Sequence, residues 1–165
     1  MPISMTPDQY FDAFVLRNYE DFIDNPGCVR HALNAAVAAS QMADHYFAYY
    51  KRHEPSKVNQ YKTFGDYIEQ ISRSTNGHFR NIRSISTAYK HLYTDVDPNK
   101  AKYSSVASAG AIETLQFSNE EVEKIYEDFS DRNCSAVIYT TKSGQQCQFM
   151  IALKAVVEYW EKQFS

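Results

Sequence analysis

Between Gly77 and Asp95, apolar side chains recur every three or four residues, which restricts this stretch to a helix with one packed side. The apolar positions are Phe79, Ile82, Ile85, Tyr89 and Leu92. Polar and basic residues lie beside them, namely Arg80, Arg83, Thr87, Lys90 and His91. No acidic residue occurs from position 70 to position 94. The sequence therefore predicts a packed helix that also concentrates positive charge and titratable groups.

Caps and helix breakers divide residues 6–94 into four predicted helices. The first begins at Thr6-Pro7-Asp8, where a hydroxyl can cap the helix, proline suits its first position and an acid favours its positive end. It ends at Asn25-Pro26-Gly27. The other three are expected over Cys28–His53, Lys57–Ser74 and Gly77–Asp95.

The pattern changes after residue 99, where short stretches rich in β-forming residues follow one another. Strands are expected over Tyr103–Ser108, Ala111–Phe117, Ala136–Thr141 and Gln145–Phe149, and helices over Glu120–Phe129 and Met150–Phe164. The short helix is expected because Ser118 and Glu121 form a capping box.

These elements predict a mainly α fold, a bundle of four to five long helices with a small C-terminal antiparallel sheet and a final helix. We expect a single domain over residues 1–165. Residues 6–94 would form its helical core, 100–149 its strands and short helix, and 150–164 its last helix.

Composition narrows the classes of function. A net charge of −3 argues against a protein that coats nucleic acid with its whole surface. Cys28, Cys134 and Cys147 form no close pair, so neither a disulfide framework nor a zinc site is expected. No signal peptide or membrane span is visible. We expect a cytoplasmic protein without a metal, cofactor or membrane partner.

Common catalytic motifs are absent from the sequence, including glycine-rich phosphate loops, H-E-x-x-H and G-x-S-x-G. The basic helix is therefore the main candidate for chemistry. Arg83 could bind a phosphate and His91 could transfer a proton, which together suit cleavage of a phosphodiester. Arg80, Thr87 and Lys90 would support binding.

A second polar line runs along the predicted helix 28–53. His31, Asn34, Gln41 and His45 are spaced by three, seven and four residues, so they share one side of that helix. One interpretation is an exposed or interface stripe. The other is a binding surface that faces the basic helix across a cleft.

The long helices followed by R-N-I-R-S-I-S-T-A-Y-K-H-L resemble the HEPN superfamily, the higher-eukaryote and prokaryote nucleotide-binding domain. The resemblance covers residues 29–93 and implies a helical, dimeric protein. Many members are RNases with four to six residues between an arginine and a histidine, and others are non-catalytic partners. Seven residues separate Arg83 from His91, a departure from that motif. The segment A-Y-K-H-L is also similar to bacterial helical proteins of comparable layout.

Three hypotheses follow. The first is a HEPN-like non-catalytic module, a homodimer that acts by protein, RNA or nucleotide binding. The second is a metal-independent RNase of a toxin or antiphage system that uses Arg83 and His91. The third is a small-molecule pocket lined by tyrosines between the predicted helices 28–53 and 77–95.

Overall fold

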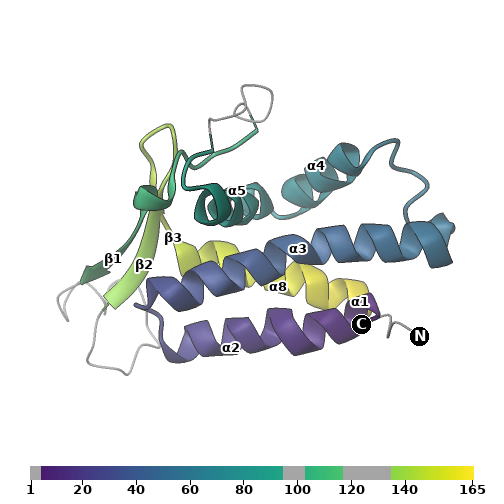
Figure 1. Cartoon of the computed structure of the whole chain (residues 1–165), viewed down its shortest axis with the longest axis horizontal. Coiled ribbons are helices and arrows are strands. Elements are labelled where there is room, and N and C mark those ends of the chain that lie inside the picture. Colours follow the sequence, from purple (N-terminus) through teal and green to yellow (C-terminus); the bar gives the residue numbers. More distant parts are fainter. Residues whose placement is uncertain (1–4, 95–102, 117–134) are drawn as a thin grey trace.

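The computed structural model describes residues 5–94, 103–116 and 135–165, which form a helical bundle with a small antiparallel sheet at one end (Figure 1). The helices are α1 Pro7–Tyr10, α2 Arg17–Asp24, α3 Val29–His53, α4 Phe64–Ser74, α5 His78–His91 and α8 Phe149–Phe164. The strands are β1 Ile112–Gln116, β2 Ser135–Thr140 and β3 Gln146–Gln148. Short 3-10 segments cover Pro55–Lys57 and Ala109–Ala111. The predicted mainly α fold is confirmed.

The first helix contains an unusual central segment. Residues Phe11–Leu16 form a π-helix, here η1, which joins α1 to α2 in one continuous rod. The rod begins as the sequence predicts, with the Thr6 N–H donating to Gln9 Oε1 at 3.1 Å and proline at the first helical position. π-segments are rare and are frequent at functional sites.

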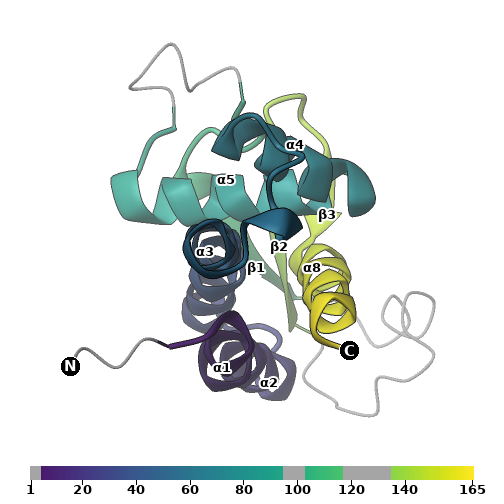
Figure 2. The same ribbon diagram turned by 90° about the vertical axis from the view of Figure 1, so that its right-hand side faces the viewer.

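Helix α3 is the central element of the bundle. The α1–η1–α2 rod lies on one side of it and α4 and α5 lie on the other, with α8 alongside (Figures 1 and 2). Its buried side consists mainly of alanines, Ala32, Ala35, Ala36, Ala38, Ala39 and Ala43. These small side chains let the neighbouring helices approach closely, and the structure confirms this predicted helix almost to the residue.

Helix α4 starts later than predicted, at Phe64 rather than near Lys57. A reciprocal cap fixes this start. Thr63 Oγ1 accepts the Asp66 N–H at 3.1 Å, and Asp66 Oδ2 accepts the Thr63 N–H at 3.1 Å. The capped start outweighs the apolar spacing that extended the prediction toward residue 57.

The apolar stripe of α5 is buried only in part. Phe79, Ile82 and Ile85 are fully buried, whereas Tyr89 and Leu92 are 49% and 53% exposed. Ala88 makes the buried contact instead near the end of the helix. The helix ends at His91 because Leu92 adopts a φ of +67°, so the prediction that it reaches Asp95 is wrong by at least its last turn.

The sheet has the order β1-β2-β3, and both pairs are antiparallel. Ile112 pairs with Tyr139, and Ile138 pairs with Gln148. These strands confirm three of the four that were predicted. Residues 103–108 form a loop on α5 instead, because the Ser105 N–H donates to Ser84 Oγ at 3.0 Å. The predicted helix Glu120–Phe129 lies outside the described residues.

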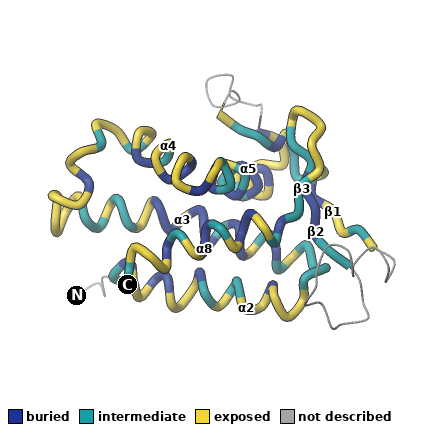
Figure 3. The backbone as a smooth tube through the Cα atoms, turned by 180° about the vertical axis from the view of Figure 1, so that it is seen from behind, coloured by how far each residue is buried: buried dark blue, intermediate teal, exposed yellow. Residues whose placement is uncertain are grey.

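Most of the buried apolar side chains belong to one hydrophobic cluster, and buried residues are coloured dark blue in Figure 3. Trp160 of α8 is fully buried and packs edge-on against Phe79 of α5, with ring centroids 6.4 Å apart. The core therefore lies between α3, α5 and α8. The sides of these helices that leave the core are the surfaces where a ligand could bind.

Candidate functional site

Arg83 lies between three helices. Its Nη1 is 3.1 Å from Asp44 Oδ2 and 3.5 Å from Ser40 Oγ, both on α3. Its Cζ lies 5.4 Å from the centre of the Phe64 ring on α4. The guanidinium group thus makes an ion pair and a cation–π contact that join α5 to its neighbours.

His91 is the exposed last residue of α5. It follows Arg83 by eight residues, which corresponds to about 12 Å along a helix axis. Within one chain the Arg83 side chain is directed at α3, and His91 lies about two turns further along α5. The two side chains do not converge on one point within the described chain.

The supporting residues of the basic helix have different surroundings. At the start of α5, the Arg80 Nε–H donates to the Tyr103 carbonyl at 2.8 Å. The Thr87 hydroxyl donates to the Arg83 carbonyl one turn earlier at 3.0 Å. Lys90 is exposed. It follows Arg83 by seven residues and so lies on the same side of α5.

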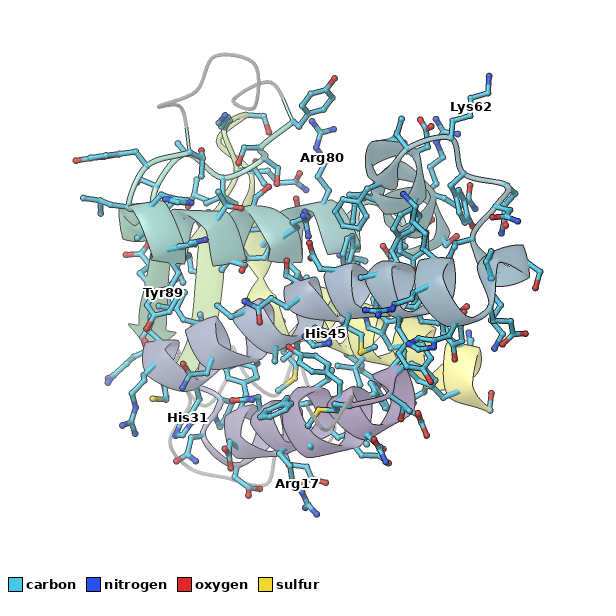
Figure 4. The ribbon with its side chains drawn as sticks, turned by 45° about the vertical axis from the view of Figure 1, so that its right-hand side comes forward. Arg17, His31, His45, Lys62, Arg80 and Tyr89 are labelled. Atoms are coloured by element: carbon cyan, nitrogen blue, oxygen red, sulfur yellow. The ribbon has the colours of Figure 1, made fainter. Side chains whose placement is uncertain are left out.

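An open groove of about 360 Å³ lies along part of the polar line of α3. The groove is lined by Tyr10, Phe14, Asn18, Asn34, Val37, Ala38, Gln41 and Tyr89. Asn34 and Gln41 are two members of the polar line. His45 stacks on the Tyr10 ring with centroids 4.1 Å apart, and His31 lies one turn before Asn34 (Figure 4).

Four helical segments build the walls of the groove. Tyr10 and Phe14 come from the end of α1 and from the π-helix η1, and Asn18 comes from α2. Tyr89 approaches from α5 on the opposite side (Figure 4). Phe14 and Tyr89 are 43% and 49% exposed, so each presents much of its ring to solvent. The groove thus has half-exposed aromatic rings in its walls and residues of α3 as its floor.

Several hydrogen-bonding groups in the groove have unused capacity. The Tyr10 hydroxyl donates to Gln41 Oε1 and the Ala38 carbonyl, both at 3.4 Å. The Asn18 amide donates to the Phe14 carbonyl at 2.8 Å. These contacts use the oxygen of Gln41 and the nitrogen of Asn18. The Asn34 amide has no partner within the described part of the chain.

Tyr10 is 6% exposed, and burial together with the negative charge of Asp44 raises its pKa to about 12. The hydroxyl is therefore protonated at neutral pH and remains a donor to Gln41. None of the eight lining residues carries a formal charge at neutral pH. The groove is an uncharged site with donors, acceptors and aromatic surface.

Among the described residues, no group of three or more His, Cys, Asp or Glu side chains is arranged to hold a metal ion. None of the helices in that part of the chain combines the length and the hydropathy needed to cross a membrane. Comparisons with protein-family models, with curated proteins and with solved structures give no match to this chain. The site is thus defined by its own geometry.

Sequence reasoning did not single out Tyr10, Phe14, Asn18 or Tyr89 as members of a site. It assigned Tyr89 to the packed side of its helix, on the basis of apolar spacing. The tyrosine-lined pocket was expected between the helices now seen as α3 and α5. The groove uses both of these helices and adds the first one. The i, i+4 spacing of Tyr10 and Phe14 is visible in the sequence, but it does not reveal that these rings lie beside the polar line of α3.

Proposed function

We propose that this chain is a HEPN-like, non-catalytic binding module that holds a small ligand in the groove between α1–η1, α3 and α5. The observation that carries the proposal is the set of half-exposed rings and unused amides around one uncharged space. Its volume lies near the lower end of the range of about 300–1,000 Å³ that is typical of small-molecule sites.

The surroundings of the basic helix support a non-catalytic role. An RNase site needs a free cation beside a proton-transferring group. Arg83 is engaged with Asp44 and Phe64, and His91 lies about two turns away. Cleavage of mixed-sequence RNA with EDTA present, lost in His91→Ala, would contradict this part of the proposal.

Self-association is part of the proposal. Leu92 and Tyr93 are more than half exposed next to Tyr89, at the end of α5. Apolar side chains grouped in this way are common in contacts between protein copies. Analytical ultracentrifugation over a wide concentration range tests it, and a constant monomer mass would contradict it.

The ligand-binding part is tested by a screen of small aromatic compounds, read out by calorimetry or by chemical shifts. We expect hits whose binding is lost in Tyr89→Ala, because that ring forms one wall. Tyr103→Ala is the matched control, since Tyr103 is also exposed, does not line the groove and is not part of the proposed self-association patch. Equal effects of the two variants, or no hits, would contradict the proposal.

A further inference from the structure

The α3 floor of the groove has an amide at each end and an apolar middle. Asn34 and Gln41 supply the amides, and Val37 and Ala38 lie between them. The Gln41 N–H groups are unused within the described part of the chain, because the contact with Tyr10 engages the amide oxygen. The exposed Asn34 amide offers two further N–H groups. The floor therefore presents two sets of donors that are separated by apolar surface.

The spacing of these donors restricts the conformation of a ligand. Seven positions of α3 separate Asn34 from Gln41, which corresponds to about 10.5 Å along the helix axis. In a polyproline II helix, the carbonyls on one side recur about every 9.3 Å, because three residues make a turn. In a β-strand they recur about every 6.6 Å, and in an α-helix they are engaged internally. The donors thus match the carbonyls of a polyproline II segment best.

The aromatic walls suit proline side chains. Phe14 and Tyr89 are 43% and 49% exposed and come from different walls, η1 and α5. Phe14 packs against Tyr10 with ring centroids 5.1 Å apart, and Tyr10 stacks on His45, so neighbouring rings hold Phe14 in place. Proline-rich segments dock into aromatic-lined grooves, since their preformed conformation loses little entropy on binding.

We propose that the groove binds an uncharged, proline-rich segment of another protein in the polyproline II conformation. This inference rests on the proposed function, because it names the ligand class of the same site. About three to four residues of such a segment would span the floor. Their carbonyls would accept from Asn34 and Gln41. Proline brings no N–H of its own, so the segment is rich in acceptors, which is what the unused donors require.

Two other occupants suit the groove less well. A charged side chain entering it would lose water without gaining an opposite charge, because none of the eight lining residues is charged. A second copy of this chain offers no proline-rich segment. No two of its prolines lie within four positions of each other, as the sequence shows for Pro2, Pro7, Pro26, Pro55 and Pro98. The partner is therefore a different protein.

The test is calorimetric titration of the full chain with a nonapeptide of three Ala-Pro-Pro repeats, acetylated and amidated so that it carries no charge. The control peptide has three Ala-Gly-Gly repeats, with the same number of carbonyls but neither proline rings nor a preformed conformation. We expect the proline peptide to bind, and the glycine peptide to bind at least about tenfold more weakly. Equal affinities would overturn the inference.

The role of the floor is tested with Asn34→Asp, which removes the amide donors and keeps the size of the side chain. It should weaken binding of the proline peptide about tenfold, because a peptide carbonyl loses its donor. Asn59→Asp is the matched control, since it makes the same change at an exposed position outside the groove. It should leave binding unchanged. Equal affinities of the two variants would contradict the predicted contact.

The outcomes separate this inference from the proposed function. If small aromatic compounds bind and lose affinity in Tyr89→Ala while the proline peptide does not bind, the inference fails and the ligand-binding groove stands. If nothing binds and Tyr89→Ala behaves like Tyr103→Ala throughout, both fail. Binding of the proline peptide that weakens in Tyr89→Ala and in Asn34→Asp, with both control variants unchanged, supports both.

Discussion

The two halves of α5 share one apolar spacing and have different surroundings. In the first half, Phe79, Ile82 and Ile85 are fully buried, and Arg83 is tied to α3 and α4. At the other end, Tyr89 and Leu92, the residue that follows the helix, are about half exposed, and Tyr89 forms a wall of the groove. The same periodicity thus serves packing at one end and an accessible surface at the other.

This difference shows that an apolar stripe predicts which residues share a helix face but does not predict whether that face is buried. Burial depends on whether a neighbouring element covers that face. Phe79 is covered by Trp160 of α8, whereas Tyr89 lies over an open groove. The first half of α5 should therefore govern stability, and the second half should govern ligand binding.

The largest expected effect is the loss of stability in Ile82→Ala. Ile82 is fully buried, so its truncation leaves a cavity and should lower the free energy of unfolding by about 2–5 kcal/mol. Leu92→Ala is the control from the exposed end and should change it by less than about 0.5 kcal/mol. Urea denaturation measures both, and similar losses in the two variants would remove the distinction between the halves.

Raising the pH above about 10 should lower the free energy of unfolding through Tyr10, which lies in the groove wall opposite Tyr89. The Tyr10 pKa is raised from 10.0 to about 12, so its stabilising contribution is complete below pH 10 and is lost as pH rises through about 12. Stability measured at several pH values should fall less steeply over this interval in Tyr10→Phe than in wild type. An identical fall would show that Tyr10 does not set it.

Arg83→Met should lower the free energy of unfolding by about 1 kcal/mol, because it removes a partly exposed ion pair and a contact with an aromatic ring. Lys90 lies on the same side of the helix in its exposed half, so Lys90→Met should change the free energy of unfolding by less than about 0.5 kcal/mol. The Arg83 effect should shrink in high salt. If Lys90→Met were the more destabilising variant, the comparison would be reversed.

The smallest expected effect is a gain. Leu92 has a φ of +67°, a conformation that glycine adopts without steric cost. Leu92→Gly should therefore raise the free energy of unfolding by about 0.5–1 kcal/mol. Lys90→Gly, within the helix, should lower it by about 1 kcal/mol. Thermal denaturation compares the two, and a loss in Leu92→Gly would show that its side chain contributes more than its backbone costs.

Much of the fold could be predicted because its signals are local. Proline, glycine and capping residues set the ends of the first helix and of α3. Short stretches rich in β-forming residues located three strands. Two predicted helix ends were wrong. The cap at Thr63 outweighed the apolar spacing before α4, and the positive φ of Leu92 ended α5 early.

The site was less accessible to sequence reasoning. The polar line of α3 was visible from spacing alone, and Asn34 and Gln41 of that line do border the groove. The residues opposite them were not identifiable, because spacing along one helix does not reveal which neighbour covers it. Tyr10 and Gln41 are 31 residues apart in the chain, and only packing brings them within 3.4 Å.

The sequence by itself determined most of the helices and strands and which residues share a helix face, since hydrogen bonding and capping act over a few residues. Tertiary structure decided which faces are covered. It paired Arg83 with Asp44 across 39 positions of the chain and left Tyr89 over an open groove. The physical reason is that packing depends on the close approach of whole helices. The alanines of α3 permit this approach along part of that helix, but no single segment specifies which neighbour packs there.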